Sequence, residues 1–129
     1  MRTLHTVTLS MLAGAALGGI AVQGLNAQVK STKAYTVTEL QTLDAKLAAE
    51  VAPRIAKAQE TFGGHNFKTG GGKVTAMEGP PPPERIAITE WESLAKAQEF
   101  FKSKAWTDLA SERDKALKTI RRYAVEERN

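Results

Sequence analysis

Hydrophobic and polar positions in the chain follow first a strand pattern and then a helix pattern. Residues 34–40 are rich in β-branched and aromatic side chains, which is typical of a strand. The apolar residues that follow recur at every fourth position: Leu43, Leu47, Val51 and Ile55. This spacing predicts a helix from Thr42 to Phe62 with one apolar stripe. Pro53 lies inside it, and we expect a kink or a break there because a proline leaves a carbonyl without its donor.

The middle of the chain is predicted to contain short strands joined by loops. Residues 65–67 and 74–77 flank the glycine-rich run 69–72, and together they predict a short hairpin. The four prolines at 80–83 predict a stiff connector between strands. Residues 85–91 then resume the alternating pattern of a strand.

Two capped helices and a final strand complete the pattern. Ser93 and Ser103 each precede a helical repeat, where a serine oxygen accepts a hydrogen bond from the first turn. The first repeat comprises Leu94, Ala97 and Phe101, and the second comprises Trp106, Leu109, Ala110, Arg113 and Leu117. Residues 120–125 predict the last strand. The order of elements indicates an α+β domain at 33–126, a ferredoxin-like β-α-β-β-α-β sheet with helices on one face, and a polar tail at 127–129.

The first 27 residues have the composition of a secretory signal peptide. Arg2 gives a positive start, an apolar run of Leu, Ala, Gly and Val follows, and no acidic residue occurs before Glu39. Ala27 is a small residue before a cleavage site at Gln28, and residues 28–32 form a short linker. We therefore expect a periplasmic or secreted protein that contacts the membrane only in transit. The alternative is an uncleaved N-terminal anchor, although the apolar run is shorter than the roughly 20 residues that span a bilayer.

The composition excludes several classes of function. The chain has 129 residues, 25% of them charged, no cysteine and a formal net charge of +4, which becomes +3 without Arg2. A chain without cysteine has no disulfides, iron–sulfur clusters, thiolate zinc sites or cysteine nucleophiles. Beyond the signal segment His65 is the only histidine, so we expect no metal site and no cofactor. Acidic and basic residues alternate along the chain, which argues against binding of nucleic acid.

Five short motifs follow one another along the chain: Phe62-Gly63-Gly64-His65, Gly70-Gly71, Glu78-Gly79-Pro80, Glu90-Trp91-Glu92-Ser93 and Phe100-Phe101-Lys102-Ser103-Lys104-Ala105-Trp106. Together they resemble the signature of domain-of-unknown-function family 1330, over about Lys33 to Glu126. The resemblance implies a dimeric α/β barrel, in which two ferredoxin-like subunits pack sheet to sheet. That superfamily includes monooxygenases, haem-degrading enzymes, isomerases and decarboxylases. The chain departs from the family at Thr69, Lys104 and Trp106, where arginine, proline and tyrosine are common.

Arg113 and Glu90 are the charged candidates for a ligand site. Arg113 falls in the apolar stripe of the last helix, where an unpaired guanidinium is costly to bury. It binds an anion in a pocket between helix and sheet, forms a structural ion pair, for example with Glu90, or extends its charged end to the solvent at the edge of the stripe. Glu90 shares a strand face with Ile86 and Ile88. It is therefore an acid or base with a raised pKa, an ion-pair partner, or a solvated residue at the sheet edge.

Three further side chains are candidates for the wall of such a pocket. His65 follows two glycines at a strand start, where it is a general base, a single haem ligand or a solvated surface histidine. Tyr35 and Trp106 either wall a pocket for a flat ligand, with Tyr35 as its polar tip, or belong to the core and an interface. The candidate ligand-binding residues are therefore Tyr35, His65, Glu90, Trp106 and Arg113.

Two classes of function remain open. The first is an exported domain that binds a small organic ligand, acidic or aromatic, in a pocket between helices and sheet. To this class the resemblance adds a cofactor-free barrel enzyme of the monooxygenase or isomerase kind. The second is a non-catalytic structural or interaction protein that acts as a homodimer. In both cases a sheet with helices on one side leaves its other face to be buried, so we expect a homodimer through that face.

Overall fold

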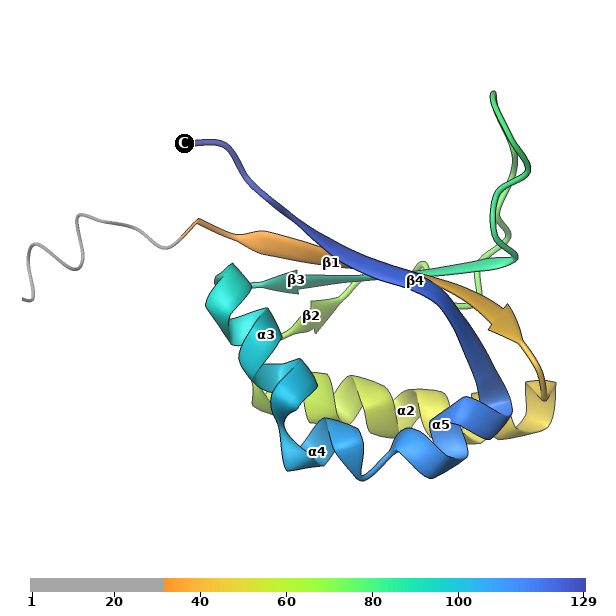
Figure 1. The fold of residues 1–129 in the computed structure, drawn as a ribbon, viewed down its shortest axis with the longest axis horizontal. Coiled ribbons are helices and arrows are strands. Elements are labelled where there is room, and N and C mark those ends of the chain that lie inside the picture. The colour runs from red at the N-terminus through yellow and green to blue at the C-terminus, as the bar shows by residue number, and fades with distance from the viewer. Residues whose placement is uncertain (1–31) are drawn as a thin grey trace, which may run out of the picture. The chain divides into compact units, whose positions relative to one another are not determined.

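The computed structural model describes residues 32–129, which form a four-stranded antiparallel sheet with helices on one side (Figure 1). The expected signal segment and its cleavage site at Ala27 and Gln28 lie outside the described residues. The strands are β1 (Ala34–Thr42), β2 (His65–Asn66), β3 (Arg85–Trp91) and β4 (Leu117–Glu126), in the order β2-β3-β1-β4. This order and the antiparallel pairing confirm the predicted ferredoxin-like α+β fold.

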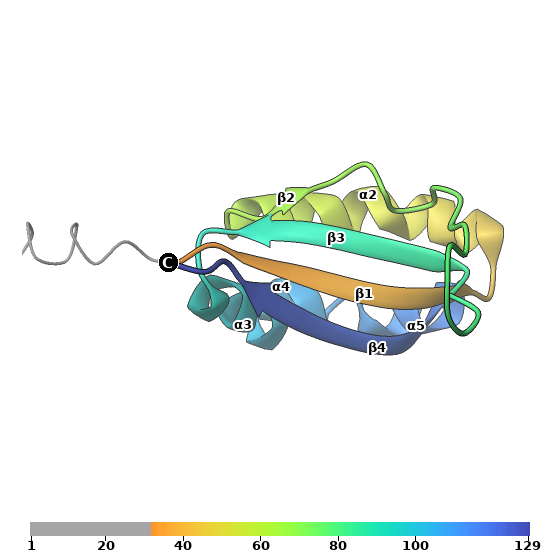
Figure 2. The same cartoon turned by 90° about the horizontal axis from the view of Figure 1, so that it is seen from above.

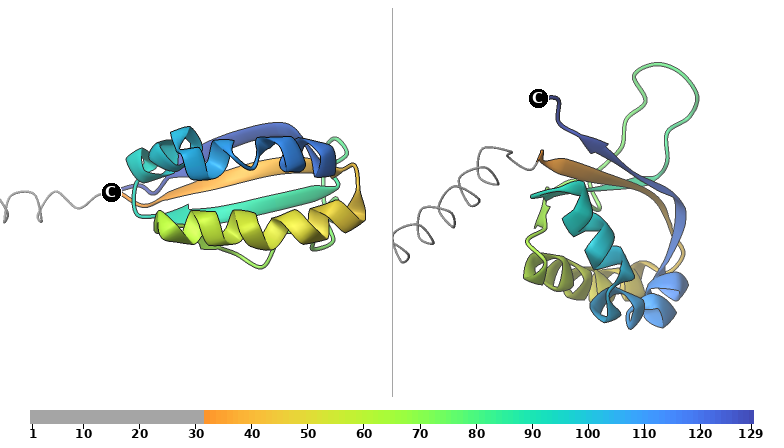
Figure 3. Two further views of the ribbon diagram at one scale, coloured as in Figure 1. Left: turned by 90° about the horizontal axis from the view of Figure 1, so that it is seen from below. Right: turned by 60° about the vertical axis from the view of Figure 1, so that its left-hand side comes forward.

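The helices are α2 (Ala45–Thr61), α3 (Leu94–Lys102), α4 (Lys104–Thr107) and α5 (Ala110–Ala116). All four lie on the same side of the sheet, while its opposite face carries no helix (Figures 2 and 3). Ser93 and Ser103 cap α3 and α4 as the sequence predicts. The cap of α2 is Asp44 and not Thr42, because the Asp44 carboxylate accepts a hydrogen bond from the Leu47 N–H at 3.0 Å.

Three details of the sequence prediction differ from the structure. The helix α2 continues through Pro53 without a break. The predicted helix after Ser103 is divided into α4 and α5, and Leu117 already belongs to β4. The predicted strand at 74–77 is absent from the described residues, because β2 is only two residues long and offers too short a ladder for pairing. Residues 67–84 instead form a long loop that rises past one end of the sheet, away from the helices (Figures 1 and 3).

The core between the sheet and the helices consists of two clusters. The aliphatic cluster contains Leu40, Ala48, Val51, Ala116 and Leu117, and the aromatic cluster contains Trp91, Ala97, Phe100 and Trp106. The Trp91 indole N–H donates a buried hydrogen bond of 2.9 Å to the Thr36 hydroxyl. A Cβ at position 64 would lie 3.0 Å from the Trp91 ring, which explains the glycine there. The motif around Gly64 therefore fixes the packing of the end of α2 against β3.

Side chains of the strands alternate between the two faces of the sheet, as strand geometry requires. The covered face, which carries the helices, contains Thr36, Thr38, Leu40, Ala87, Thr89, Trp91, Arg122 and Ala124. The open face contains Tyr35, Val37, Glu39, Ile86, Ile88, Glu90, Arg121, Tyr123 and Val125. Ile120 is an extra residue of β4 at a bulge, where the register with β1 shifts between Glu39 and Leu40. The bulge sets which of the following β4 residues face the helices.

Candidate functional site

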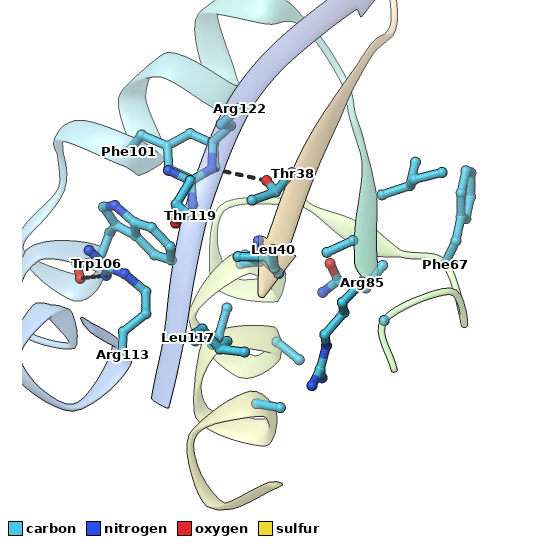
Figure 4. Close-up of a pocket in the computed structure, with 18 residues that line it drawn as sticks. Thr38, Leu40, Phe67, Arg85, Phe101, Trp106, Arg113, Leu117, Thr119 and Arg122 are labelled. Atoms are coloured by element: carbon cyan, nitrogen blue, oxygen red, sulfur yellow. Dashed lines mark hydrogen bonds between the residues drawn. The ribbon is translucent and has the colours of Figure 1, made fainter. Parts of the chain in front are cut away.

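A cavity of about 220 Å³ lies between the helices and the covered face of the sheet (Figure 4). Its middle is lined by apolar side chains that include Leu40, Ile55, Ala87 and Leu117. Trp106, Arg113 and Arg122 line the part beside β4. Gln59 and Asn66 line the part beside β2, and Arg85 of β3 is a further lining residue. The cavity therefore combines an apolar wall with polar groups that come from both edges of the sheet.

Arg113 is held against Trp106 by two contacts. Trp106 lies in the single-turn helix α4, and Arg113 lies one helix later in α5. The guanidinium carbon of Arg113 is 3.6 Å from the centre of the Trp106 ring, and its Nη1 donates a 3.0 Å hydrogen bond to the Trp106 carbonyl. The nearest carboxylate is that of the exposed Asp114, at 3.9 Å from Nε. Arg113 is thus positioned by an aromatic face and a backbone oxygen.

Arg122 reaches the same part of the cavity from β4 (Figure 4). Its Nε donates a 3.0 Å hydrogen bond to the Thr38 hydroxyl on β1. Its guanidinium carbon lies 4.6 Å from the centre of the Phe101 ring and 4.9 Å from that of Trp106. Within residues 32–129, no carboxylate forms an ion pair with Arg122. Two guanidinium groups therefore stack on one tryptophan. Among residues 32–129, Arg122 has no carboxylate partner and Arg113 has only the exposed Asp114 carboxylate at 3.9 Å.

The electrostatics of this pair follow from burial. Burial lowers the pKa of Arg113. Burial, together with the positive charge of Arg113, lowers the pKa of Arg122 to about 10. Arginine is not deprotonated in proteins at neutral pH, so both groups carry a positive charge although each is partly removed from water. An anion stabilises partly buried positive charges, because its negative charge offsets theirs and its oxygen atoms accept their hydrogen bonds.

The structure brings two of the five candidate residues together and places three elsewhere. Trp106 and Arg113 lie side by side at the cavity. Tyr35 and Glu90 lie on the open face, and His65 pairs with Glu90 in the sheet register. The Tyr35 hydroxyl donates to Glu127 at 3.3 Å, and Glu90 forms an ion pair of 2.8 Å with Lys33. Glu90 is therefore engaged by Lys33 and not by Arg113.

Arg122 is a cavity residue that the sequence analysis does not single out. The strand pattern over residues 120–125 places Arg122 and Ala124 on one face and Arg121 and Tyr123 on the other. Because each face carries one arginine, this alternation does not tell which of the two arginines faces the helices. The bulge at Ile120 and the packing of Phe101 decide this only in three dimensions.

Arg121, the neighbour of Arg122, lies on the open face and has an ordinary ion-pair partner. Its Nε donates to the Glu39 carboxylate at 2.5 Å, and the Tyr123 hydroxyl donates to the same oxygen at 3.0 Å. The Glu39 side chain is only 7% exposed. The hydrogen bond from Arg121 holds the pKa of Glu39 below its ordinary value, and the hydrogen bond to Glu39 raises the pKa of Tyr123.

A second pocket of about 420 Å³ shares Phe101 and Arg122 with the cavity, and Gln98 and Lys102 of α3 also line it. Among residues 32–129 no three histidine or carboxylate side chains lie close enough together to hold a metal ion. In the same range no helix is long and apolar enough to cross a membrane.

Comparison with solved structures defines the class of protein. A protein of unknown function from Rhodopseudomonas palustris, RPA0582, is similar at a TM-score of 0.57 and 13% identity, over 83% of this chain and 89% of that chain. SnoaB, a cofactor-independent oxygenase from Streptomyces nogalater, is similar at a TM-score of 0.50 and 10% identity, over 77% of this chain and 96% of that chain. These likenesses show the fold alone, a four-stranded antiparallel sheet with helices on one face.

The family follows from the sequence itself. Residues 33–127 match the family described as "Domain of unknown function (DUF1330)", and the chain belongs to this family. No curated protein matches the chain. The family description assigns no reaction or ligand, so any function has to be argued from the cavity and the sheet.

Replacing Glu39 by glutamine is expected to destabilise the protein at pH 7, because the substitution removes the charge that Arg121 and Tyr123 contact. The pKa of Glu39 is lower in the folded protein than its ordinary value of 4.5. The contribution of the ionised Glu39 side chain to the free energy of unfolding is therefore complete above pH 4.5 and is lost as the pH falls through the folded-state pKa. Urea denaturation of wild type and Glu39→Gln between pH 7 and pH 3 measures this. If the free energies of unfolding of wild type and Glu39→Gln differed equally at pH 7 and pH 3, the assigned role of Glu39 would be wrong. Glu60→Gln, at an exposed position, is the matched control.

Proposed function

We propose that the protein binds a small organic acid in the cavity and holds its carboxylate with Arg113 and Arg122. The observation that carries this proposal is the pair of partly buried guanidinium groups beside Trp106. In the described structure Arg122 has no carboxylate partner, and Arg113 has only the exposed Asp114 at 3.9 Å. Native proteins rarely bury a charged group without a partner, because the loss of hydration is costly. A bound carboxylate supplies that partner and accepts charge-assisted hydrogen bonds from both arginines.

The rest of the cavity supports a small and largely apolar ligand. Leu40, Ile55 and Leu117 line its middle, and the rings of Phe101 and Trp106 lie beside the arginines. Its volume of about 220 Å³ is below the roughly 300–1,000 Å³ that is common for drug-sized ligands. The cavity thus suits a short acid whose apolar body lies against the aliphatic cluster.

The cavity supports binding in preference to acid–base catalysis. General acids and bases in proteins are mostly histidine, aspartate, glutamate, lysine, tyrosine or cysteine. Among the described residues that line the cavity, none is of these types. His65 and Glu90, the two candidates for acid–base work, are not among these lining residues. The function that we propose is therefore that of a binding module.

Replacement of either arginine is expected to weaken acid binding roughly 10-fold or more, because a hydrogen bond to a charged group contributes about 1.5–3 kcal/mol. Calorimetric titration of the purified domain with hexanoate and benzoate, and with the uncharged hexanamide and benzamide, measures this. We expect the acids to bind wild type more tightly than the amides, and Arg113→Met and Arg122→Met to remove the preference. Arg121→Met is the matched control, because Arg121 lies on the open face. Equal binding of acids and amides, or no acid binding at millimolar concentration, would contradict the proposal.

We also propose that two copies of the domain associate through the open face. This face presents apolar side chains, among which Val125 is 56% exposed and Tyr123 is 47% exposed. Proteins of this fold class are usually dimeric. Burial of apolar surface is the main favourable contribution to association of this kind. A protein that served only as a structural homodimer would share this association but would bind no acid, so the two experiments separate the two classes of function.

A charge in the middle of the open face is expected to dissociate the dimer. Val37 lies in the central strand β1, between Ile88 of β3 and Tyr123 of β4. Val37→Asp would place a carboxylate in the buried interface, where it has no partner and loses its hydration. Sedimentation velocity at micromolar concentration is expected to show a dimer for wild type and a monomer for Val37→Asp. The exposed Lys57→Asp on α2 should stay dimeric. A wild-type monomer would refute the proposed interface.

We propose, finally, that the protein is exported and that residues 1–27 are removed during transit. The support is the order of a positive start, an apolar run and a small residue at Ala27. Immunoblotting of separated fractions from the producing cell is expected to show a shortened protein in the periplasmic or secreted fraction. A full-length band that remains with the membrane would favour the anchored alternative instead.

A further inference from the structure

The end of the cavity beside β2 contains a buried polar group without a partner. Asn66 lines the cavity, and its Oδ1 accepts a 2.6 Å hydrogen bond from the Thr89 hydroxyl. Its side-chain nitrogen, Nδ2, is buried and has no hydrogen-bond partner in the described structure. An unpaired buried donor costs about 1–3 kcal/mol, and native proteins contain few of them. The Asn66 amide is therefore held in place by Thr89 and has a donor left for another molecule.

A second amide lies in the same part of the cavity. Gln59 is 8% exposed, comes from the last turns of α2 and lines the cavity. Its backbone carbonyl accepts hydrogen bonds from the N–H groups of Phe62 and Gly64, which fix the end of the helix beside β2. The part of the cavity near β2 thus presents two amide side chains, with Arg85 of β3 as a further lining residue, whereas the part near β4 carries the pair Arg113 and Arg122.

The sheet order gives the distance between these two ends. The Arg122 side chain reaches back to Thr38, so its guanidinium lies above β1. Two strand spacings separate β1 from β2, which corresponds to about 10 Å across the sheet. Asn66 is level with Thr36, two residues from Thr38 along β1, so the separation of the two ends is about 12 Å. Two hydrogen bonds of about 3 Å each, one to a guanidinium and one to Asn66, use part of that span. A chain of only a few carbon atoms fills the remainder, beside Ile55 and Ala87.

We infer that the ligand is a short apolar acid that carries a second hydrogen-bond acceptor, such as a carbonyl oxygen, at the end remote from its carboxylate. This inference rests on the proposed function, because it takes the carboxylate to lie at Arg113 and Arg122. The remote acceptor accepts a hydrogen bond from the Asn66 side-chain nitrogen, and the apolar body crosses the middle of the cavity. An oxo acid satisfies both ends, whereas a purely aliphatic acid leaves the Asn66 donor unpaired.

Two matched pairs of acids test the inference. The acid 5-oxohexanoate differs from 5-methylhexanoate by an oxygen in place of a methyl group, and 4-acetylbenzoate differs from 4-isopropylbenzoate in the same way. We expect wild type to bind the oxo member of at least one pair about 5-fold to 50-fold more tightly, because a site with a buried donor rejects an analogue that lacks the acceptor. Calorimetric titration of the purified domain measures the four dissociation constants.

The variant Asn66→Leu is expected to remove this preference while binding of the aliphatic member stays within about 3-fold of wild type. If the single variant does not fold because the Thr89 hydroxyl loses its partner, Asn66→Leu combined with Thr89→Val replaces both groups by apolar ones. Arg122→Met, in contrast, should weaken both members of a pair equally. Equal binding of both members of both pairs by wild type, or a preference that Asn66→Leu retains, would overturn the inference and leave the proposed function standing. Failure of all four acids to bind would overturn both.

Discussion

The sheet carries helices on only one of its faces, and most of the remaining structure depends on this constraint. Because side chains alternate along each strand, every strand residue belongs either to the cavity under the helices or to the open face. The covered face is filled by two core clusters and keeps a cavity between them. The open face has no cover of its own in the described chain, and apolar side chains are exposed on it. The proposed ligand site and the proposed dimer interface therefore lie on different sides of one sheet.

Two neighbouring arginines show what this alternation does to charge. Arg121 lies on the open face, and its hydrogen bond with Glu39 is of the kind that stabilises a fold. Arg122, one residue later, lies under the helices against Phe101 and Trp106 and has a threonine hydroxyl as its partner. The nearby positive charge of Arg113 makes the charged form of Arg122 less favourable. A group held at such a cost by packing on both sides is better explained by a ligand than by stability of the empty fold.

The sequence predicts the framework well and the site only in part. Apolar periodicity, the serine caps and the β-branched runs locate β1, β3, α2, α3 and the last strand, because these signals are local. The strand at 74–77 fails because pairing requires a long enough neighbour, which β2 is not. Trp106 and Arg113 are found through their shared helical stripe. Arg122 and Asn66 are missed because each lies in a strand whose orientation depends on a bulge or on a distant packing contact.

The central claim is that a carboxylate binds between Arg113 and Arg122 inside the cavity. Nitrogen-15 NMR of the arginine Nε–H groups during titration of the isotope-labelled domain with 5-oxohexanoate tests this most directly, because each arginine reports separately. The account predicts that the resonances of Arg113 and Arg122 shift together and saturate at one concentration of the acid, while that of Arg121 on the open face stays in place. A saturating shift of Arg121 without the other two, or no shift of Arg113 and Arg122, would contradict it.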